Sequence, residues 1–254
     1  MANPQSEIRN PRSTRANPKS EIRNPRSTRA NPQSEIRNPQ STRANPQSEI
    51  RNPKSEIPII GLVGGVASGK SLVAGQMASL GCAVVDADRI GHELLAEPAI
   101  RDRIRERFGP GVLDGSGRVD RRRLGEAVFD SPEGLRALED IVHPSLWKRV
   151  VEAVQAARTR PGAPAVVLDA ALILEKGLDR LCDCVVYIEA EEGTRQRRAR
   201  QDRGWDPPEL ARRERAQHPL KFKRGRADYC VDNNTTPERT LDQVRMILRR
   251  ITSR

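Results

Sequence analysis

The sequence predicts a three-layer α/β domain, in which helices cover both faces of a parallel five-stranded sheet. Two observations indicate this fold class. Five short apolar runs, most of them rich in β-branched residues, are spaced between residues 58 and 233. Stretches with apolar residues at three- and four-residue spacing lie between these runs, as expected for amphipathic helices. Continuous apolar strands that alternate with helices are typical of a parallel sheet buried on both faces.

A short helix is predicted to join the first two strands. PIIGLVG, residues 58–64, is a β-branched run that ends in glycine, and KSLVAGQMASLG, residues 70–81, has the pattern of a helix that Gly81 terminates. CAVVDAD, residues 82–88, is predicted to be a second strand with a polar end. The remaining strands are expected within residues 163–174, 182–190 and 227–233, and a last helix from about Pro237 to Arg250.

A longer stretch, about residues 89–162, separates the second and third strands and is predicted to be mostly helical. Its segments with helical periodicity are EPAIRDRIRERFG, DRRRLGEAVF, SPEGLRALEDIV and HPSLWKRVVEAVQAAR. Ser131, which Pro132 follows, predicts one helix start, and Pro144 suits the first turn of another helix. The stretch is too long for a plain crossover. We therefore expect a helical insertion over the carboxyl edge of the sheet, where open α/β sheets bind ligands.

Residues 1–57 differ in kind from the rest of the 254-residue chain. They repeat seven-residue units such as NPQSEIR and NPRSTRA. A seven-residue period suggests a coiled coil, but each unit carries a proline, which would break a helix every second turn. Large apolar residues are too scarce to offset the entropy of ordering the chain. We therefore predict a disordered repeat tail, followed by one folded domain at residues 58–254.

The formal net charge of +11 comes mostly from two segments. The tail holds 11 Lys and Arg against 5 acids, and residues 195–226 hold 12 against 4. Glutamates interleave with the basic residues of the tail and aromatic residues are lacking, so nucleic-acid binding is not expected. The four cysteines lack metal-site spacing, which favours buried, reduced thiols and a cytoplasmic location. No apolar run is long enough for a membrane span.

Residues 64–71 carry the phosphate-loop pattern G-x-x-x-x-G-K-[ST], between a predicted strand and a predicted helix as the motif requires. Its glycines let backbone N–H groups turn inward, and the helix start adds partial positive charge. Lys70 can reach the β- and γ-phosphates, and Ser71 can ligate Mg²⁺. The motif predicts a fold of the phosphate-loop NTPase type. The predicted nucleotide-binding residues are Gly64, Gly65, Val66, Ala67, Ser68, Gly69, Lys70, Ser71 and Leu72.

Asp86 and Asp88 follow at the end of the second predicted strand. In a strand-like segment both carboxylates point to the same side. One could orient or deprotonate an acceptor hydroxyl, while the other helps to place it or the waters of a metal ion. The alternative is a solvated strand end that caps the next helix. Beside a phosphate loop we favour the catalytic role.

Two further positions have both a functional and a structural interpretation. Asp169, at the end of the third strand, is placed to bind the waters of a metal ion, and Glu175 follows six residues later. Either carboxylate could instead cap a helix. His143 would more often be structural as a lone histidine, but its place in the insertion leaves a substrate contact open.

The Arg-rich segment, about residues 191–226, is predicted to form two helices around RGWDPP. Such a helical pair after the fourth strand suits a lid that closes on a nucleotide. Arginines supply planar donors to a transferring phosphoryl group and replace water around it. Most of these charges must be solvated, and only one to three can touch phosphate. Gly204 and the Pro207-Pro208 pair mark a turn between the helices.

Together these segments resemble the dephospho-coenzyme A kinase family over essentially all of residues 58–250. GLVGGVASGKS resembles its phosphate loop, VVDADRIGHELL its Asp-Ala-Asp segment, and GRVDRRRLGEAVF with LEDIVHP its helical insertion. LDAALILEKGLD resembles its third strand. RGWDPPELARRERAQ comes next, and KRGRADYCVDN is similar to its K-x-x-x-A-D-x-x-x-x-N block.

The resemblance implies ATP- and Mg²⁺-dependent transfer of the γ-phosphoryl group to the ribose 3′-hydroxyl of dephospho-coenzyme A, the last step of coenzyme A biosynthesis. A monomer is expected. For catalysis the resemblance implies Asp88, Lys70 and Arg203, and it places Asn233 near the adenine end of ATP. The implied metal ligands are Ser71 and, through water, Asp169. The residues implied at the acceptor are Asp86, Asp88, His92 and His143.

One departure from the family concerns the end of the third strand. The family usually has proline followed by two leucines there, where this chain reads Ala171-Leu172-Ile173. The loss of that proline could alter how Asp169 is presented. Among enzymes, the alternative is another small-molecule or nucleoside monophosphate kinase. The alternative from a different class is a nucleotide-dependent switch or a nucleic-acid-binding protein with the repeats as a basic arm.

Overall fold

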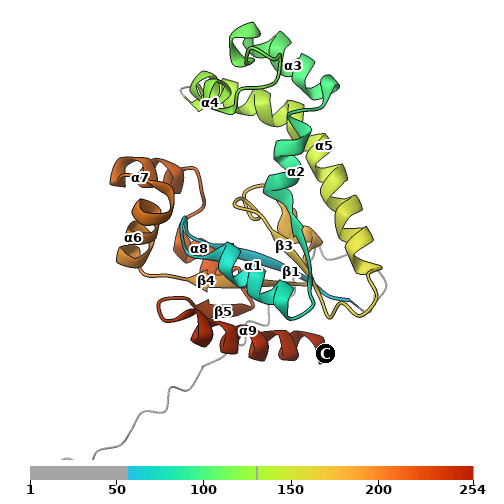
Figure 1. The fold of residues 1–254 in the computed structure, drawn as a ribbon, viewed down its shortest axis with the longest axis vertical. Helices are drawn as coiled ribbons and strands as arrows, with labels where there is room; N and C mark the ends of the chain where they lie inside the picture. Colours follow the sequence, from blue (N-terminus) through green and yellow to red (C-terminus); the bar gives the residue numbers. More distant parts are fainter. Residues whose placement is uncertain (1–56, 130, 254) are drawn as a thin grey trace, which may run out of the picture. The chain divides into compact units, whose positions relative to one another are not determined.

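The computed structural model describes residues 57–129 and 131–253. Their centre is a five-stranded sheet (Figure 1) with all neighbouring strands parallel, in the order β2-β3-β1-β4-β5. The strands are β1 (Ile59–Gly64), β2 (Ala83–Asp86), β3 (Val166–Asp169), β4 (Cys184–Glu189) and β5 (Tyr229–Asp232). The predicted parallel five-stranded sheet is confirmed. The predicted disordered tail, residues 1–57, lies outside the described residues except for Ile57.

The strand order decides which residues meet at the carboxyl edge of the sheet. Because all strands run the same way, their carboxyl ends lie side by side. Asp169 at the end of β3 is in register with Asp86 of β2 on one side and with Leu62 of β1 on the other. The loop that leaves β1 after Gly64 therefore starts next to the carboxylates at the ends of β2 and β3.

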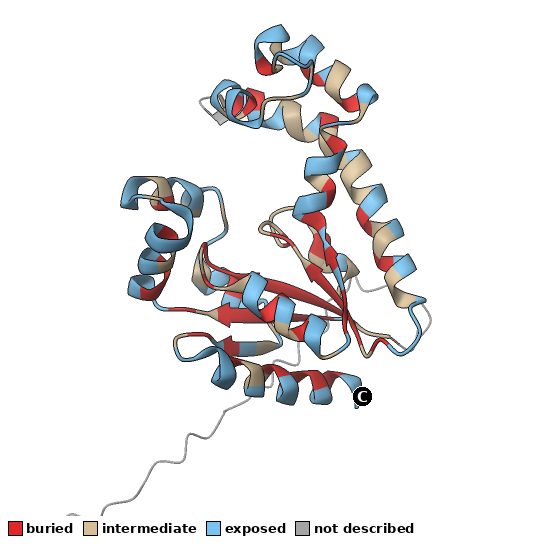
Figure 2. Ribbon diagram, in the orientation of Figure 1, coloured by how far each residue is buried: buried red, intermediate tan, exposed pale blue. Residues whose placement is uncertain are grey.

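Helices cover both faces of the sheet. Helices α1 (Lys70–Ser79) and α9 (Pro237–Thr252) pack on one face, and α2 (Ala87–Leu94) and α5 (Pro132–Arg158) pack on the other. The side chains of β1 alternate between the two cores, as expected for a strand: Ile60 and Leu62 join the first, Ile59 and Val63 the second. Figure 2 shows the buried residues gathered on the strands and on the helix faces turned to them.

The insertion between β2 and β3 has a small apolar core of its own. It contains α3 (Pro98–Phe108), the 3₁₀-helix η1 (Pro110–Val112), α4 (Arg121–Phe129) and the first part of α5. The buried residues of this core are Ile100, Ile104, Val112, Leu124, Val128 and Ile141. Ser131 caps α5 as predicted, because its hydroxyl accepts a hydrogen bond from the Gly134 N–H at 3.0 Å. The mostly helical insertion is thus observed.

Helix α5 corrects one prediction. The two helices expected on either side of Pro144 are a single helix of 27 residues, with Pro144 inside it. A proline inside a helix lacks the N–H donor and costs about 3 kcal/mol. Buried apolar residues continue on both sides of it, with Ile141 before and Val150 and Val154 after. Since each such side chain contributes about 1.5–3 kcal/mol on burial, packing outweighs the cost.

The Arg-rich segment folds as α6 (Glu192–Arg203), α7 (Pro207–Arg215) and α8 (Leu220–Gly225). Gly204 ends α6 with φ +65°, and the Asp206 carboxylate caps α7 by accepting from the Glu209 N–H at 2.9 Å. The two predicted helices and the turn between them are therefore present, and α8 was not predicted.

Two other predictions concern the described residues as a whole. Within residues 57–129 and 131–253, no helix is long and apolar enough to cross a membrane. No disulfide joins the four cysteines, all of which lie within the described residues, but they are not all buried, because Cys230 in the edge strand β5 is exposed.

Candidate active site

The phosphate loop connects β1 to α1 and has two residues with positive φ, Ala67 at +57° and Gly69 at +94°. Gly69 is the N-cap of α1, so the helix begins at Lys70. A Cβ atom on Gly69 would lie 2.1 Å from Nδ2 of Asn233. Only glycine fits here, because a side chain would both collide and hold a backbone conformation that L-residues rarely adopt. The motif glycine thus makes room for another part of the chain.

Lys70 stands at the first position of α1 and turns toward the sheet edge. Burial lowers the pKa of its ammonium group, and the positive charges of Lys223 and Arg203 lower it further, whereas Asp169 and Asp88 raise it. The lysine therefore lies within electrostatic reach of both carboxylates and of one arginine from the Arg-rich segment.

Asp86, Asp88 and Asp169 form a carboxylate cluster around this lysine. Burial raises the pKa of Asp169, and repulsion by Asp86 and Asp88 raises it further, whereas Lys70 lowers it. No three carboxylates, histidines or cysteines among the described residues are grouped as a cage for a metal ion. The cluster therefore supplies single ligands and not a complete metal site.

Asp86 and Asp88 do not share the strand-like geometry that the sequence suggested. Strand β2 ends at Asp86, whose carboxylate caps α2 by accepting from the Arg89 N–H at 2.8 Å. The capping alternative is therefore correct for Asp86. Asp88 lies in the first turn of α2 and reaches across to the residue after β3, accepting from the Ala171 N–H at 3.0 Å.

The surroundings of Asp88 shift its pKa in both directions. Burial raises the pKa of this carboxyl and Asp86 adds repulsion, whereas the hydrogen bond from Ala171 and the charges of Lys70 and His92 lower it. Ala171 is where this chain departs from the family's proline, which has no N–H to donate. The departure therefore bears on Asp88, and not only on Asp169 as the sequence suggested.

The two histidines lie in different places. His92, one turn after Asp88 on α2, is close enough to lower the pKa of Asp88. His143 lies within α5, where its ring stacks with the Trp147 ring at 6.3 Å between centroids. The structure thus brings His92 to the carboxylate cluster and places His143 in the insertion helix.

The arginines of the Arg-rich segment divide into two groups. Arg203 is exposed, its guanidinium lies 4.8 Å from the centre of the Trp205 ring, and its charge reaches Lys70. Arg195 is buried and binds the Glu214 carboxylate at 3.1 Å, and Arg198 donates to the Ser68 carbonyl at 3.2 Å. Arg203 therefore keeps a guanidinium available for a ligand, while Arg195 and Arg198 bind protein groups.

A second buried ion pair ties the Arg-rich segment to the sheet edge. Lys223 on α8 is 2% exposed and lies 3.0 Å from the Glu175 carboxylate. It also donates to Gln217, and Glu175 accepts from the His218 N–H at 2.7 Å. The Glu175 side chain is thus structural, and Lys223 is close enough to repel the charge of Lys70.

Asn233, predicted to lie near the adenine end of ATP, contacts the phosphate loop. Its side chain is buried and donates to the Ser68 carbonyl at 2.7 Å, while its Oδ1 accepts from the Thr240 hydroxyl at 3.1 Å. These contacts use the amide group within the protein. The Asn233 side chain thus supports the phosphate loop, and its expected place near the adenine end of ATP stays a prediction.

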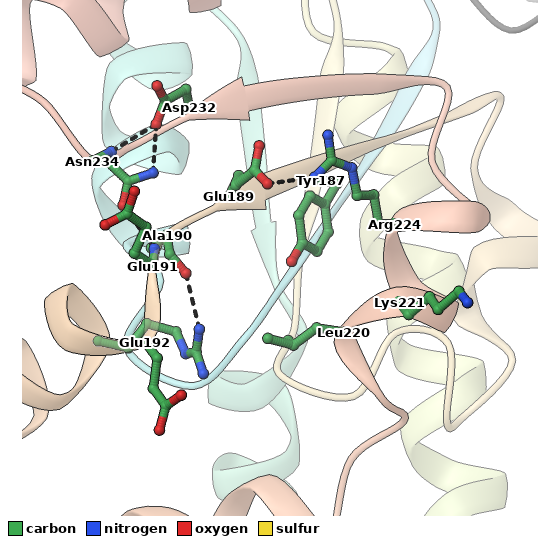
Figure 3. Close-up of a pocket in the computed structure, with 11 residues that line it drawn as sticks. Tyr187, Glu189, Ala190, Glu191, Glu192, Leu220, Lys221, Arg224, Asp232 and Asn234 are labelled. Atoms are coloured by element: carbon green, nitrogen blue, oxygen red, sulfur yellow. Dashed lines mark hydrogen bonds and ion pairs between the residues drawn. The ribbon is translucent and has the colours of Figure 1, made fainter. Parts of the chain in front are cut away.

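A cavity of about 620 Å³ lies at the carboxyl ends of β4 and β5, against α6 and α8 (Figure 3). Arg195 and Leu220, two of its lining residues, also lie beside Gly65 of the phosphate loop. Lys70 and the carboxylate cluster do not line it. The cavity therefore adjoins the loop, apart from the place where the charged catalytic candidates gather.

A family model described as dephospho-CoA kinase matches residues 58–238. This chain belongs to the dephospho-CoA kinase family. The dephospho-CoA kinase of Symbiobacterium thermophilum is 44% identical over 190 residues, which cover 73% of this chain and 78% of the relative. That of Geobacillus kaustophilus is 39% identical over 192 residues, which cover 75% of this chain and 94% of the relative.

Two solved structures share the fold of this chain. TT1252 from Thermus thermophilus superposes with a TM-score of 0.67 at 33% identity, covering 77% of this chain and 98% of its own. The dephospho-CoA kinase from Campylobacter jejuni shares the fold, with a TM-score of 0.54 at 22% identity over 78% of this chain and 100% of its own.

Sequence reasoning about this dephospho-CoA kinase family member missed two contacts. The Ala171 N–H that binds Asp88 is a backbone group, and no side-chain pattern announces it. The contact of Arg198 with Ser68 joins residues 130 positions apart. The only available signal was the excess of arginines in the Arg-rich segment, which does not say which of them turns inward.

Proposed function

We propose that this chain is an ATP-dependent dephospho-CoA kinase, which transfers the γ-phosphoryl group to the ribose 3′-hydroxyl of dephospho-CoA. The observation that carries this proposal is the position of Asp88, an accessible carboxylate with a raised pKa beside Lys70 at the end of the phosphate loop. Membership in the family supports the same acceptor. The folded domain, residues 58–254, contains all the residues involved.

Asp88 serves as the base in this proposal. Its carboxylate is anchored through one oxygen by the Ala171 N–H, which leaves the other oxygen available to the acceptor hydroxyl. Burial raises its pKa toward the working pH, and an acceptor for a proton is most effective in that range. The proton of the 3′-hydroxyl passes to Asp88 as the oxygen attacks the γ-phosphorus.

Positive groups from two elements stabilise the charge that develops on the transferring group. The free N–H groups at the start of α1 point along the helix axis toward the β-phosphate, and Lys70 adds a full charge. Arg203 supplies a guanidinium from the Arg-rich segment, which acts as a lid over the nucleotide.

The residues at the sheet edge fit a magnesium ion that the phosphates largely hold. Ser71 is exposed at the second position of α1 and offers its hydroxyl, and Asp169 offers a carboxylate that can bind waters of the ion. Mg²⁺ prefers one or two such protein ligands together with phosphate oxygens and water, so the absence of a cage among the described residues agrees with it. When bound, the ion neutralises phosphate charge.

The acceptor is held on the insertion side. Asp86 and His92 flank Asp88 on the same short segment, which supports their assignment to the ribose of the acceptor. His143 in α5 provides a further polar group from the insertion, residues 89–162. A nucleoside monophosphate kinase remains the alternative, because the choice of acceptor lies in this insertion.

ADP release measured with and without dephospho-CoA tests the proposal. Asp88→Asn should lower acceptor-dependent turnover by about 10²–10⁴-fold, because the amide cannot accept the proton. Asp86→Asn is the matched comparison. It keeps the cap of α2, since asparagine caps as well as aspartate, and should lower turnover less than Asp88→Asn does.

Two outcomes would contradict the proposal. ADP release that does not depend on dephospho-CoA would identify a nucleotide-dependent switch. Unchanged turnover in Asp88→Asn would remove Asp88 as the base.

A further inference from the structure

We propose that Asn233 and Arg198 are positioning residues for the nucleotide, because together they hold the Ser68 carbonyl and thereby orient the phosphate-binding N–H of Gly69. This inference rests on the proposed function only in taking a nucleotide as the ligand of the loop. Asn233, Arg198 and Thr240 are called the brace below.

The brace contacts the loop at one oxygen atom from two directions. Asn233 donates through Nδ2 to the Ser68 carbonyl at 2.7 Å, and Arg198 donates through Nη1 to the same oxygen at 3.2 Å. Arg198 also donates through Nη2 to the Asn233 carbonyl at 2.9 Å. One guanidinium therefore joins the loop to the residue that follows β5.

Because the peptide bond is planar, this contact also sets the orientation of an N–H group in the phosphate site. In a trans peptide the C=O of one residue and the N–H of the next point in opposite directions. Holding the Ser68 oxygen against the brace directs the Gly69 N–H away from it. No backbone carbonyl among residues 57–129 and 131–253 accepts this N–H, so it is free for an anion.

The orientation of the Asn233 amide is itself fixed. The Thr240 hydroxyl, on α9, donates to Asn233 Oδ1 at 3.1 Å, which leaves the Nδ2 group to face the loop. The Asn233 N–H donates to the Glu189 carbonyl at 2.9 Å. Asn233 and Thr240 are 1% and 0% exposed. Water therefore cannot replace these bonds without a structural change.

The loop has no room to move against the brace. Asn233 Nδ2 fills the space that a Cβ atom on Gly69 would need, at 2.1 Å, and the next nearest group is Arg198 Nη1. Gly69 is thus packed against the same two side chains that bind Ser68. The same two side chains thus hold the peptide between Ser68 and Gly69 by hydrogen bonds to Ser68 and by packing against Gly69.

The test is ADP affinity of full-length variants, measured by titration calorimetry without acceptor. Asn233→Leu keeps the volume but removes the donor, and Arg198→Met removes the guanidinium. Each should raise the Kd for ADP about tenfold. Arg198→Lys keeps one donor and should recover part of the affinity. Arg197→Met, at an exposed position of the same helix, is the control and should bind ADP like the wild type.

A second measurement separates positioning from a loss of fold. The Gly69 amide resonance should shift strongly on ADP binding in the wild type and in Arg197→Met, and less in Arg198→Met. An unchanged Kd in both brace variants would overturn the proposal, as would a lowered melting temperature with ADP binding intact. Because no acceptor is present, the result stands whether or not dephospho-CoA is the substrate.

Discussion

The phosphate loop and the carboxylate cluster are neighbours at one edge of the sheet, but they are held in different ways. The loop acts through backbone groups, and residues from α6, from the end of β5 and from α9 hold it in one conformation. The cluster acts through side chains, and Asp88 has one hydrogen bond, from the Ala171 N–H.

Because of this difference, we expect the phosphate loop and the carboxylate cluster to respond to different changes. Backbone N–H groups do not titrate, so their contribution to binding should respond to changes in shape and hardly to pH. Carboxylates titrate, and burial together with neighbouring charges shifts the pKa of Asp88 and Asp169. We therefore expect nucleotide binding to depend mainly on the conformation of the loop. Activation of the acceptor hydroxyl should depend mainly on the charges around Asp88.

The substitution with the largest expected effect disrupts the conformation of the phosphate loop. Gly69→Ala should weaken ADP binding about a thousandfold, or about 4 kcal/mol, because the new Cβ meets Asn233 and the backbone has φ +94°. Gly75→Ala, in the same helix α1, is the control. A Cβ on Gly75 meets nothing within 4 Å, so this variant should bind ADP normally and be slightly more stable. Equal affinity of both variants for ADP would show that nucleotide binding does not depend on the conformation of the loop at Gly69.

An intermediate effect concerns the ion pair between Lys223 of the Arg-rich segment and Glu175, which follows β3. Lys223→Met should lower the free energy of unfolding by about 3 kcal/mol, because it leaves the Glu175 carboxylate buried without its cation. Adding Glu175→Gln removes that charge and should restore much of the loss. Urea unfolding of the single and double variants measures this. A double variant no more stable than Lys223→Met would contradict the pairing.

The smallest expected effect tests how a hydrogen bond sets the pKa of Asp88 in the carboxylate cluster. The base must be ionised, and the Ala171 N–H lowers the pKa of Asp88. Ala171→Pro removes this donor, so the pKa rises and the acid limb of kcat/KM should move up by about 0.5–1 pH unit. Ala171→Ser keeps the N–H and should not move it. ADP affinity should be unchanged in both, and an unshifted acid limb in Ala171→Pro would show that the hydrogen bond does not tune Asp88.

The sequence predicted best what short segments determine. The phosphate loop is a continuous motif, and the five strands are apolar runs with clear ends, so both were found. The order of the strands depends on pairing between segments more than a hundred residues apart, such as β1 with β3 and β1 with β4, and no local pattern encodes it.

The errors in the candidate site have physical causes. Asp88 was assigned to a strand because VVDAD continues an apolar run, but the Asp86 cap starts a helix between the two carboxylates. Pro144 was taken as a helix start because the packing that outweighs its cost comes from other elements. The contacts of Asn233 with Ser68 and Thr240 were not predicted, because these residues become its neighbours only in the folded chain.

Helix α5 has a mechanical consequence. With 27 residues it is about 40 Å long, and it joins the core of the insertion at one end to the sheet at the other. A tilt of about 10° at the sheet would displace the far end by roughly 7 Å over that length. Pro144, near the middle, is where one backbone hydrogen bond is already missing and bending costs least. The helix is therefore a long arm with a soft point, and small motions at the sheet become large ones at the tip of the insertion.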